Sequence, residues 1–217
     1  NKISRKSKYL IFHLNNNSFL IIHLGMTGTI HLISKKNCRN TNVSFYGFSN
    51  LPAKHNHILI FLKKYQFIYN DPRRFGFIKI LKNKKNLAFF FNNVGPEPLN
   101  RKFKISYIFN YLKGKKKCIK SFLLDQKFVS GIGNIYASEI LNYSKISPFK
   151  QAKKLSKIDI KNIKYFSKFV LNKAIKKGGS SIRDFKNIKG KSGNYQKEFK
   201  VYQRENLNCL NKSCYGK

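Results

Sequence analysis

Short runs of apolar, β-branched and aromatic residues, separated by polar turns, fill the first hundred positions of the chain. Residues 8–32 read KYLIFHL, a polar NNNS turn and FLIIHLGMTGTIHLI, which predicts two strands joined in a hairpin. Further strand candidates are Val43–Phe48, His57–Leu62, Phe67–Tyr69 and Gly76–Leu81. This part of the chain is therefore predicted to be an antiparallel sandwich or barrel.

The pattern changes after the segment GPEPL, Gly95–Leu99, where two prolines mark a boundary. Apolar residues then follow helical spacing, as at Ile105, Ile108, Phe109 and Leu112. An all-helical module is predicted to continue to about Ala174. A polar, glycine-containing loop and strand-like residues at Tyr195–Tyr202 follow it.

The charge of the chain narrows the class of partner. Lys and Arg number 45 against 8 Asp and Glu, so the 217 residues carry a formal charge of +37. A polyanion that neutralises this charge relieves the self-repulsion, and nucleic acid is the obvious one. Lys, Asn, Ile, Phe and Tyr are abundant throughout, as in proteins of AT-rich genomes, so charge separates DNA binding from RNA binding poorly.

The apolar runs argue against a membrane-spanning or secreted protein, and the cysteines argue against a disulfide-stabilised one. No apolar run approaches the roughly 18 residues that span a membrane, and no signal peptide opens the chain. We expect a soluble cytoplasmic protein, associated with the nucleoid of a prokaryote or endosymbiont. The four cysteines are too scattered for a disulfide scaffold, and only Cys209 and Cys214 are close enough to share a metal.

Two turn-forming segments carry candidate DNA chemistry. In DPRRFG, residues 71–76, two arginines offer forked donors and a phenylalanine offers a flat wedge, although a turn with a buried Phe and an internal Asp–Arg pair is the alternative. In HLGMTG, residues 23–28, the only methionine lies near two glycines that permit close approach, and a core methionine is the alternative. In KHNH, residues 54–57, phosphate contact by Lys54 and His55 is favoured over a metal pair or a solvated turn.

The segment from Lys120 to Leu141 is the richest. KSFLLDQ predicts one helix, GIG a hinged turn, and NIYASEIL a second helix with Asn134 at its N-cap. A helix N-terminus and freed backbone amides form a phosphate site, so this turn is expected to grip one DNA strand. A dinucleotide-binding fold is disfavoured because no strand precedes the glycines.

These motifs together resemble the formamidopyrimidine-DNA glycosylase family. The resemblance rests on HLGMTG, KHxH, DPRRFG, GPEPL, the K-x2-LLDQ-x4-GIGNIYASEIL block and GGSSIRDF, in this order. It implies an α+β, multi-domain fold: an N-terminal antiparallel β-sandwich at 1–98, a helix-two-turn-helix domain at 99–185, and a truncated zinc-finger hairpin at 186–217. The implied activity is base-excision repair of oxidised purines in duplex DNA, by a monomer.

The resemblance also implies roles for individual residues. Met26, Arg73 and Phe75 would fill the space left by an extruded base, bond the orphaned cytosine and wedge into the base stack. Lys8 would be the proton donor in β-elimination, although a surface lysine is the alternative. The DNA-contacting residues would be Lys54, His55, Arg73, Lys116, Lys117, Lys120 and Asn134. The loop covering the extruded base would include Gly179, Ser180, Ser181 and Arg183.

The resemblance also sets expectations for the two ends of the chain. The family's nucleophile is an N-terminal proline beside a glutamate, which forms a Schiff base and leads to β,δ-elimination. We expect that segment to precede Asn1, so that the chain as given lacks glycosylase chemistry. The family's structural zinc uses two CxxC pairs, whereas Cys209 and Cys214 have four residues between them. Two thiolates do not complete a tetrahedral site, so we expect weak zinc binding or none.

Two other functions stay open at this point. A descendant that binds damaged DNA without catalysis would have lost the N-terminal nucleophile in the full gene. A ribosomal or other RNA-binding basic protein fits the composition, but it has no use for a base-replacing trio.

Overall fold

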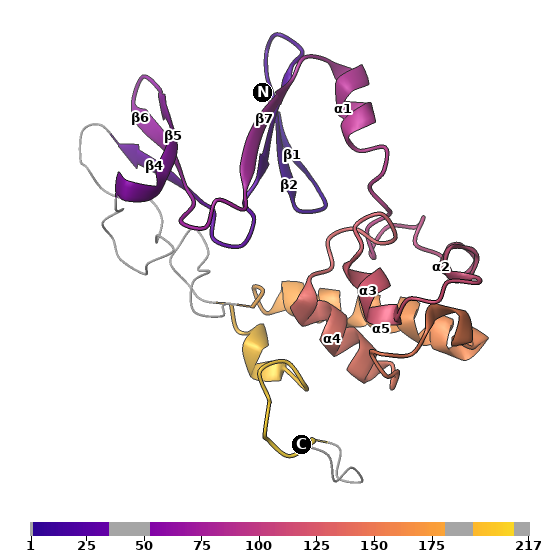
Figure 1. Cartoon of the computed structure of the whole chain (residues 1–217). Helices are drawn as coiled ribbons and strands as arrows, with labels where there is room; N and C mark the ends of the chain where they lie inside the picture. Colours follow the sequence, from indigo (N-terminus) through magenta and orange to yellow (C-terminus); the bar gives the residue numbers. More distant parts are fainter. Residues whose placement is uncertain (1, 35–52, 181–192, 211–217) are drawn as a thin grey trace. The chain divides into compact units, whose positions relative to one another are not determined.

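The computed structural model describes residues 2–34, 53–180 and 193–210, and the chain divides into two compact units (Figure 1). The first unit comprises Asn1–Phe90 and Gly178–Asn194, and the second comprises Phe91–Lys177 and Tyr195–Lys217.

Two antiparallel sheets form the first unit, which confirms the predicted β-rich N-terminal region. The larger sheet has the order β1-β2-β3-β7 and the smaller one the order β4-β6-β5. The strands are β1 Lys2–Lys6, β2 Tyr9–His13, β3 Phe19–His23, β4 Thr29–Ser34, β5 Asn56–Phe61, β6 Tyr65–Asn70 and β7 Phe77–Leu81. A short helix η1, Ala53–His55, precedes β5, and α1, Lys84–Phe90, follows β7. The central strand β3 carries Ile21 and Ile22, both fully buried.

The predicted hairpin at residues 8–32 is wrong in its second half. The structure has three strands there, because β3 ends at His23 and β4 begins at Thr29 in the other sheet. Gly25 adopts a left-handed conformation with φ of 61°, and Gly28 N–H donates to Leu24 O over 2.8 Å. This tight turn interrupts the apolar run and carries the chain from one sheet to the other. The candidate strand Val43–Phe48 lies outside the described residues.

Helices form the second unit, as the apolar spacing predicts. They are α2 Ile105–Leu112, α3 Ile119–Leu124, α4 Asn134–Tyr143 and α5 Lys157–Lys176, with short 3-10 helices η2 Ala152–Lys154 and η3 Tyr195–Glu198. Their shared core includes the fully buried Ile108, Ile119, Leu123, Phe128, Ile140, Ile163 and Val170. Burying each such side chain contributes about 1.5–3 kcal/mol, so this core is the main source of the unit's stability.

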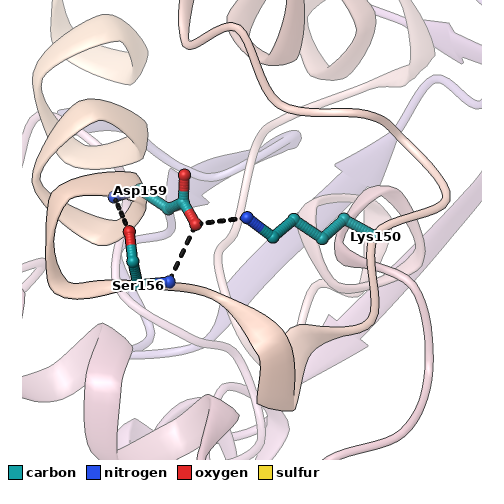
Figure 2. Close-up of polar contacts among 3 residues, drawn as sticks. All are labelled: Lys150, Ser156 and Asp159. Atoms are coloured by element: carbon teal, nitrogen blue, oxygen red, sulfur yellow. Dashed lines mark hydrogen bonds and ion pairs between the residues drawn. The ribbon is translucent and has the colours of Figure 1, made fainter.

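The longest helix, α5, begins at a capping box (Figure 2). Ser156 Oγ accepts a hydrogen bond from the Asp159 N–H over 3.0 Å, and the Asp159 carboxylate accepts one from the Ser156 N–H over 2.8 Å. Lys150 Nζ lies 2.7 Å from the same carboxylate oxygen, Asp159 Oδ2. The segment before α5 is thereby fixed to its first turn.

Two further local predictions are wrong. The strand-like Tyr195–Tyr202 begins with η3 instead, since the backbone amides of residues 200–202 donate to the Glu139 side chain and not to a neighbouring strand. The N-cap of α4 is Gly133, and Asn134 is the first helical residue.

Among the residues that the structure describes, no helix combines the length and apolar character needed to cross a bilayer.

Candidate nucleic-acid interface

Two turns of the first unit lie against each other because of the strand pairing. β3 pairs with β7, placing His23 opposite Phe77, and β4 pairs with β6, placing Thr29 opposite Asn70. The turn from β3 to β4 (residues 24–28) and the turn from β6 to β7 (residues 71–76) therefore both pass between the sheets at the same end. They touch at Gly25, where an added Cβ would lie 2.6 Å from the carbonyl carbon of Phe75.

Asp71 joins these two turns through a buried carboxylate. The Thr27 hydroxyl donates to Oδ1, while the Tyr69 hydroxyl and the Gly76 N–H donate to Oδ2 over 3.0 and 2.8 Å. Burial alone raises the pKa of this carboxyl, but the hydrogen bonds from Thr27, Gly76 and Tyr69 outweigh burial and hold the pKa below its ordinary value. Asp71 is therefore a stable anion whose donors come from three different segments.

The same hub also fixes the backbone around the turns. The Arg73 N–H donates to Thr27 Oγ1 over 3.2 Å, and the Asp71 N–H donates to His55 O over 3.0 Å. His57 Nε2 lies 2.8 Å from Asp71 O. Lys54 is exposed in η1 beside this hub. Sequence reasoning placed Lys54 and His55 near DNA, and the structure brings their segment next to DPRRFG.

Met26, Arg73 and Phe75 project from the joined turns. Met26 is 59% exposed and Phe75 is 54% exposed, so the alternatives of a core methionine and a buried phenylalanine are wrong. The Arg73 guanidinium carbon lies 4.6 Å from the centre of the Phe75 ring, in cation–π contact. The Asp71 carboxylate accepts hydrogen bonds from Thr27, Tyr69 and Gly76 instead of forming the internal Asp–Arg pair of the alternative interpretation. The unit thus presents a flexible apolar chain, a forked cation and a flat ring together.

Lys8 lies in the turn between β1 and β2, in the same unit as the trio. Burial by its surroundings lowers the pKa of its ammonium group. Burial and then the charge of Lys8 lower the pKa of His23, so the two side chains influence each other electrostatically. A lysine with a lowered pKa gives up a proton more easily than an ordinary surface lysine.

The second unit brings together two of its predicted contacts. Lys120 on α3 and Asn134 at the start of α4 line one cavity of about 550 Å³, together with Ser138, Lys145 and Tyr202. Lys116 and Lys117 are exposed in the segment before α3, and they are not among the residues lining this cavity. A helix start, amide and hydroxyl groups and two cations suit an anion such as a phosphate.

Glu139 holds the segment that contributes Val201 and Tyr202 to the lining of this cavity, and the sequence analysis assigned it no role. Its fully buried carboxylate accepts backbone N–H bonds from Lys200, Val201 and Tyr202 over 2.8, 3.0 and 3.0 Å. A glutamate inside the apolar helical stretch IYASEIL was the available signal, since buried acidic groups need partners.

The remaining predicted residues fall partly outside the described chain. Gly179 and Ser180 are described, and Ser180 forms an isolated bridge with Asn194. Ser181 and Arg183, also predicted for the covering loop, lie outside the described residues, as does Cys214. Cys209 is a half-buried free thiol. The described residues contain no group of three His, Cys, Asp or Glu side chains placed to hold a metal.

Comparison with known proteins agrees with this architecture. Residues 1–78 match the formamidopyrimidine-DNA glycosylase N-terminal domain, and residues 94–186 match the formamidopyrimidine-DNA glycosylase H2TH domain. Formamidopyrimidine-DNA glycosylase of Rickettsia bellii is 39% identical over 209 residues, which are 96% of this chain and 72% of the relative. The protein of the same name from the Wolbachia of Culex pipiens is 36% identical over 210 residues, again 96% and 72%.

Solved structures of such proteins on DNA share the fold. A Lactococcus lactis FPG mutant in complex with Fapy-dG-containing DNA matches with a TM-score of 0.82 and 33% identity, covering 97% of this chain and 73% of that one. MutM in complex with DNA containing carbocyclic 8-oxo-G matches with a TM-score of 0.82 and 34% identity, covering 97% and 72%. The matched domains, the relatives and the shared fold together show that this chain belongs to the formamidopyrimidine-DNA glycosylase family.

Proposed function

We propose that this chain recognises oxidised purines in duplex DNA for base excision, and that Met26, Arg73 and Phe75 replace the extruded base. The observation that carries the proposal is the exposure of these three side chains on two turns joined at Asp71. An extruded base leaves a gap in the stack and an unpaired partner base. A flat ring can wedge into that gap, a thioether can fill it, and a guanidinium can bond the orphaned base edge.

The remaining predicted contacts would hold the backbone of the same duplex. Lys54 and His55 beside the trio, and Lys116, Lys117, Lys120 and Asn134 in the helical unit, supply cations and donors for phosphates. Relatives have been captured with Fapy-dG, 8-oxo-G analogue and abasic-site DNA. These lesion chemistries support oxidised purines as the substrate class. We also propose that Gly179, Ser180, Ser181 and Arg183 belong to the loop that covers the extruded base.

Lys8 is the proposed proton donor of the elimination chemistry. In that chemistry a Schiff base at the sugar C1′ acts as an electron sink, and the phosphates leave by β- and then δ-elimination. A general acid must release its proton to the leaving group, and the lowered pKa of Lys8 makes that release easier.

A binding titration at moderate salt tests the proposed recognition. A duplex with a reduced abasic-site analogue opposite cytosine is compared with an undamaged duplex, for the wild-type chain, Arg73→Ala and Arg74→Ala. Arg74 is the matched control, because it is the adjacent exposed arginine and is not assigned to the trio. We expect the wild-type chain to prefer the abasic duplex by about tenfold, or about 1.4 kcal/mol.

Arg73→Ala should erase most of that preference, and Arg74→Ala should weaken both duplexes alike. Equal binding of the two duplexes by the wild-type chain would mark a general polyanion binder, as the RNA-binding alternative requires. Equal effects of the two arginine variants would remove the specific role of Arg73.

A further inference from the structure

The ring of His23 is fixed by its neighbours in the larger sheet. His23 ends β3, with Tyr9 of β2 and Phe77 of β7 as its cross-strand partners. Its ring centre lies 4.9 Å from that of Tyr9 and 5.6 Å from that of Phe77, and the Phe77 ring is stacked at 19°. The imidazole is half-buried between two aromatic rings, so its nitrogen atoms have defined directions.

One of these nitrogens contacts the turn that carries Met26. The Gly25 N–H donates to His23 Nδ1 over 3.2 Å. Gly25 has a left-handed backbone and touches the Phe75 segment of the neighbouring turn. The hydrogen bond therefore acts at the point where the two turns meet.

This contact restricts the protonation state of His23. Nδ1 can accept a hydrogen bond only if it bears a lone pair, so the proton of the neutral ring must be on Nε2. An imidazolium has protons on both nitrogens and would direct its Nδ1 proton at the Gly25 N–H. The observed turn is compatible with one of the two neutral tautomers and incompatible with the cation.

We propose that His23 is a positioning residue of the Met26 turn: the neutral Nε2–H tautomer holds the turn against the Phe75 segment, and protonation at Nδ1 releases it. This inference rests on the proposed function only for its consequence in DNA binding. Its structural part concerns the unbound chain alone.

Three neighbouring groups surround the His23 ring. They are the Tyr9 phenol on β2, the Phe77 ring on β7, and the Lys8 ammonium in the turn before β2. Burial lowers the pKa of His23 and the charge of Lys8 lowers it further. The turn is therefore held at neutral pH. The hydrogen bond is lost only as the pH falls through a pKa below the ordinary value of about 6.5.

Nuclear magnetic resonance of the unbound full chain tests the structural part. The ring nitrogens of His23 and the amide of Gly25 are followed as the pH is lowered from about 8 to about 4.5. We expect the Nε2–H tautomer at high pH, and a Gly25 amide shift that follows His23 with a midpoint below 6.5. An Nδ1–H tautomer, or a Gly25 amide that ignores the titration of His23, would overturn the proposal.

Two substitutions test the consequence for DNA. His23→Asn places an amide oxygen near the Nδ1 position without a titrating ring, and His23→Leu removes the acceptor. At pH 7.5 we expect His23→Asn to keep the abasic-duplex preference within about twofold and His23→Leu to lose most of it. Below the midpoint that the resonance titration gives for His23, the wild-type preference should fall at least threefold, while that of His23→Asn stays constant.

Equal pH dependence of the wild-type chain and His23→Asn would contradict the proposal, as would an unchanged preference in His23→Leu. Thermal unfolding of each variant shows whether a loss of preference comes from a loss of fold. If the wild-type chain itself shows no abasic preference, the proposed function fails, and the magnetic resonance titration still decides the role of His23.

Discussion

Asp71 organises the proposed recognition surface from a fully buried position. Its carboxylate accepts hydrogen bonds from the β3–β4 turn, from β6 and from Gly76 at the end of the β6–β7 turn. The motif DPRRFG singled out its neighbours Arg73 and Phe75, and both are exposed as that prediction requires. Asp71 itself could not be assigned this role from sequence, since its donors Thr27 and Gly76 are 49 positions apart and meet only through strand pairing.

Asp71→Asn should destabilise the first unit and weaken the abasic preference together. An amide must direct its NH2 group at one of the former donors, which leaves buried groups unsatisfied and costs about 2–3 kcal/mol. Urea unfolding measures the loss. Thr27→Ser, which keeps the donating hydroxyl, is the control and should change the free energy of unfolding by less than about 1 kcal/mol.

The pH dependence of unfolding gives a second measurement on Asp71. Because its pKa is lowered in the folded chain, its contribution is complete above the ordinary value of about 3.9 and is lost as the pH falls through the folded value. In Asp71→Asn, the acid-induced loss of unfolding free energy should lack the part that protonation of Asp71 causes. If the unfolding free energy of Asp71→Asn falls at acid pH as much as that of the wild-type chain, the carboxylate is not held as an anion.

At the scale of elements, the turn at residues 24–28 depends on backbone geometry. Gly25 and Gly114 both have positive φ, 61° and 73°, but an added Cβ would meet Phe75 at Gly25 and nothing within 4 Å at Gly114. The two glycines therefore share the conformational demand and differ in packing. The sequence analysis did not predict this turn, because apolar residues continue directly before and after it and read as one strand.

Gly25→Ala and Gly114→Ala separate these two effects. Both variants should lose about 1 kcal/mol of unfolding free energy, because alanine is strained in the left-handed conformation. Gly25→Ala should lose more and should also reduce the abasic preference, because the Phe75 segment must move. Chemical denaturation and the two-duplex titration give the comparison. Equal losses in the two variants would show that the turns are not in close contact.

The start of α5 provides an independent test of a helical element. Its capping box was not predicted, although Ser156 and Asp159 have the required spacing. Burial raises the pKa of Asp159, but the hydrogen bonds from Lys150 and Ser156 lower it by more. The pKa is therefore below its ordinary value. The carboxylate is thus charged at neutral pH and joins the preceding segment to the helix (Figure 2).

Ser156→Ala should lower the free energy of unfolding by about 1 kcal/mol, since one helix N–H loses its acceptor. Asp159→Asn should lose a similar amount at pH 7, and the difference from the wild-type chain should vanish as the pH falls through the lowered pKa of Asp159. Ser147→Ala, outside the box, is the control: its hydroxyl accepts only an exposed, long hydrogen bond from the Phe149 N–H over 3.4 Å, so this variant should lose less than Ser156→Ala. A pH-independent loss in Asp159→Asn would contradict the role of its charge.

At the scale of the whole molecule, the charge of +37 governs affinity more than specificity. Phosphate contacts release counterions, and six to ten of them reduce affinity by about 10³–10⁵ between 50 and 200 mM salt. Each unit contributes exposed lysines, but composition alone could not say which of the 45 basic residues face DNA.

Salt titration separates the general and specific parts of binding. Affinity for both duplexes should fall by at least about a thousandfold between 50 and 200 mM salt, while their ratio changes little. Lys116→Ala and Lys117→Ala should each reduce the slope by about one contact and leave the ratio intact. A ratio that collapses with salt would show that the preference is itself electrostatic.

The sequence by itself determined the β-rich first part, the helical second part and the family, because strand, helix and turn signals are local and the motifs keep their order. It also supplied the trio and the phosphate-binding candidates as residue types. The tertiary structure decided what lies together: that one apolar run becomes two strands in two sheets, that Asp71 joins two turns, and that Glu139 holds residues 200–202. These features depend on strand register and on buried polar groups finding donors from distant segments, and neither is encoded in local spacing.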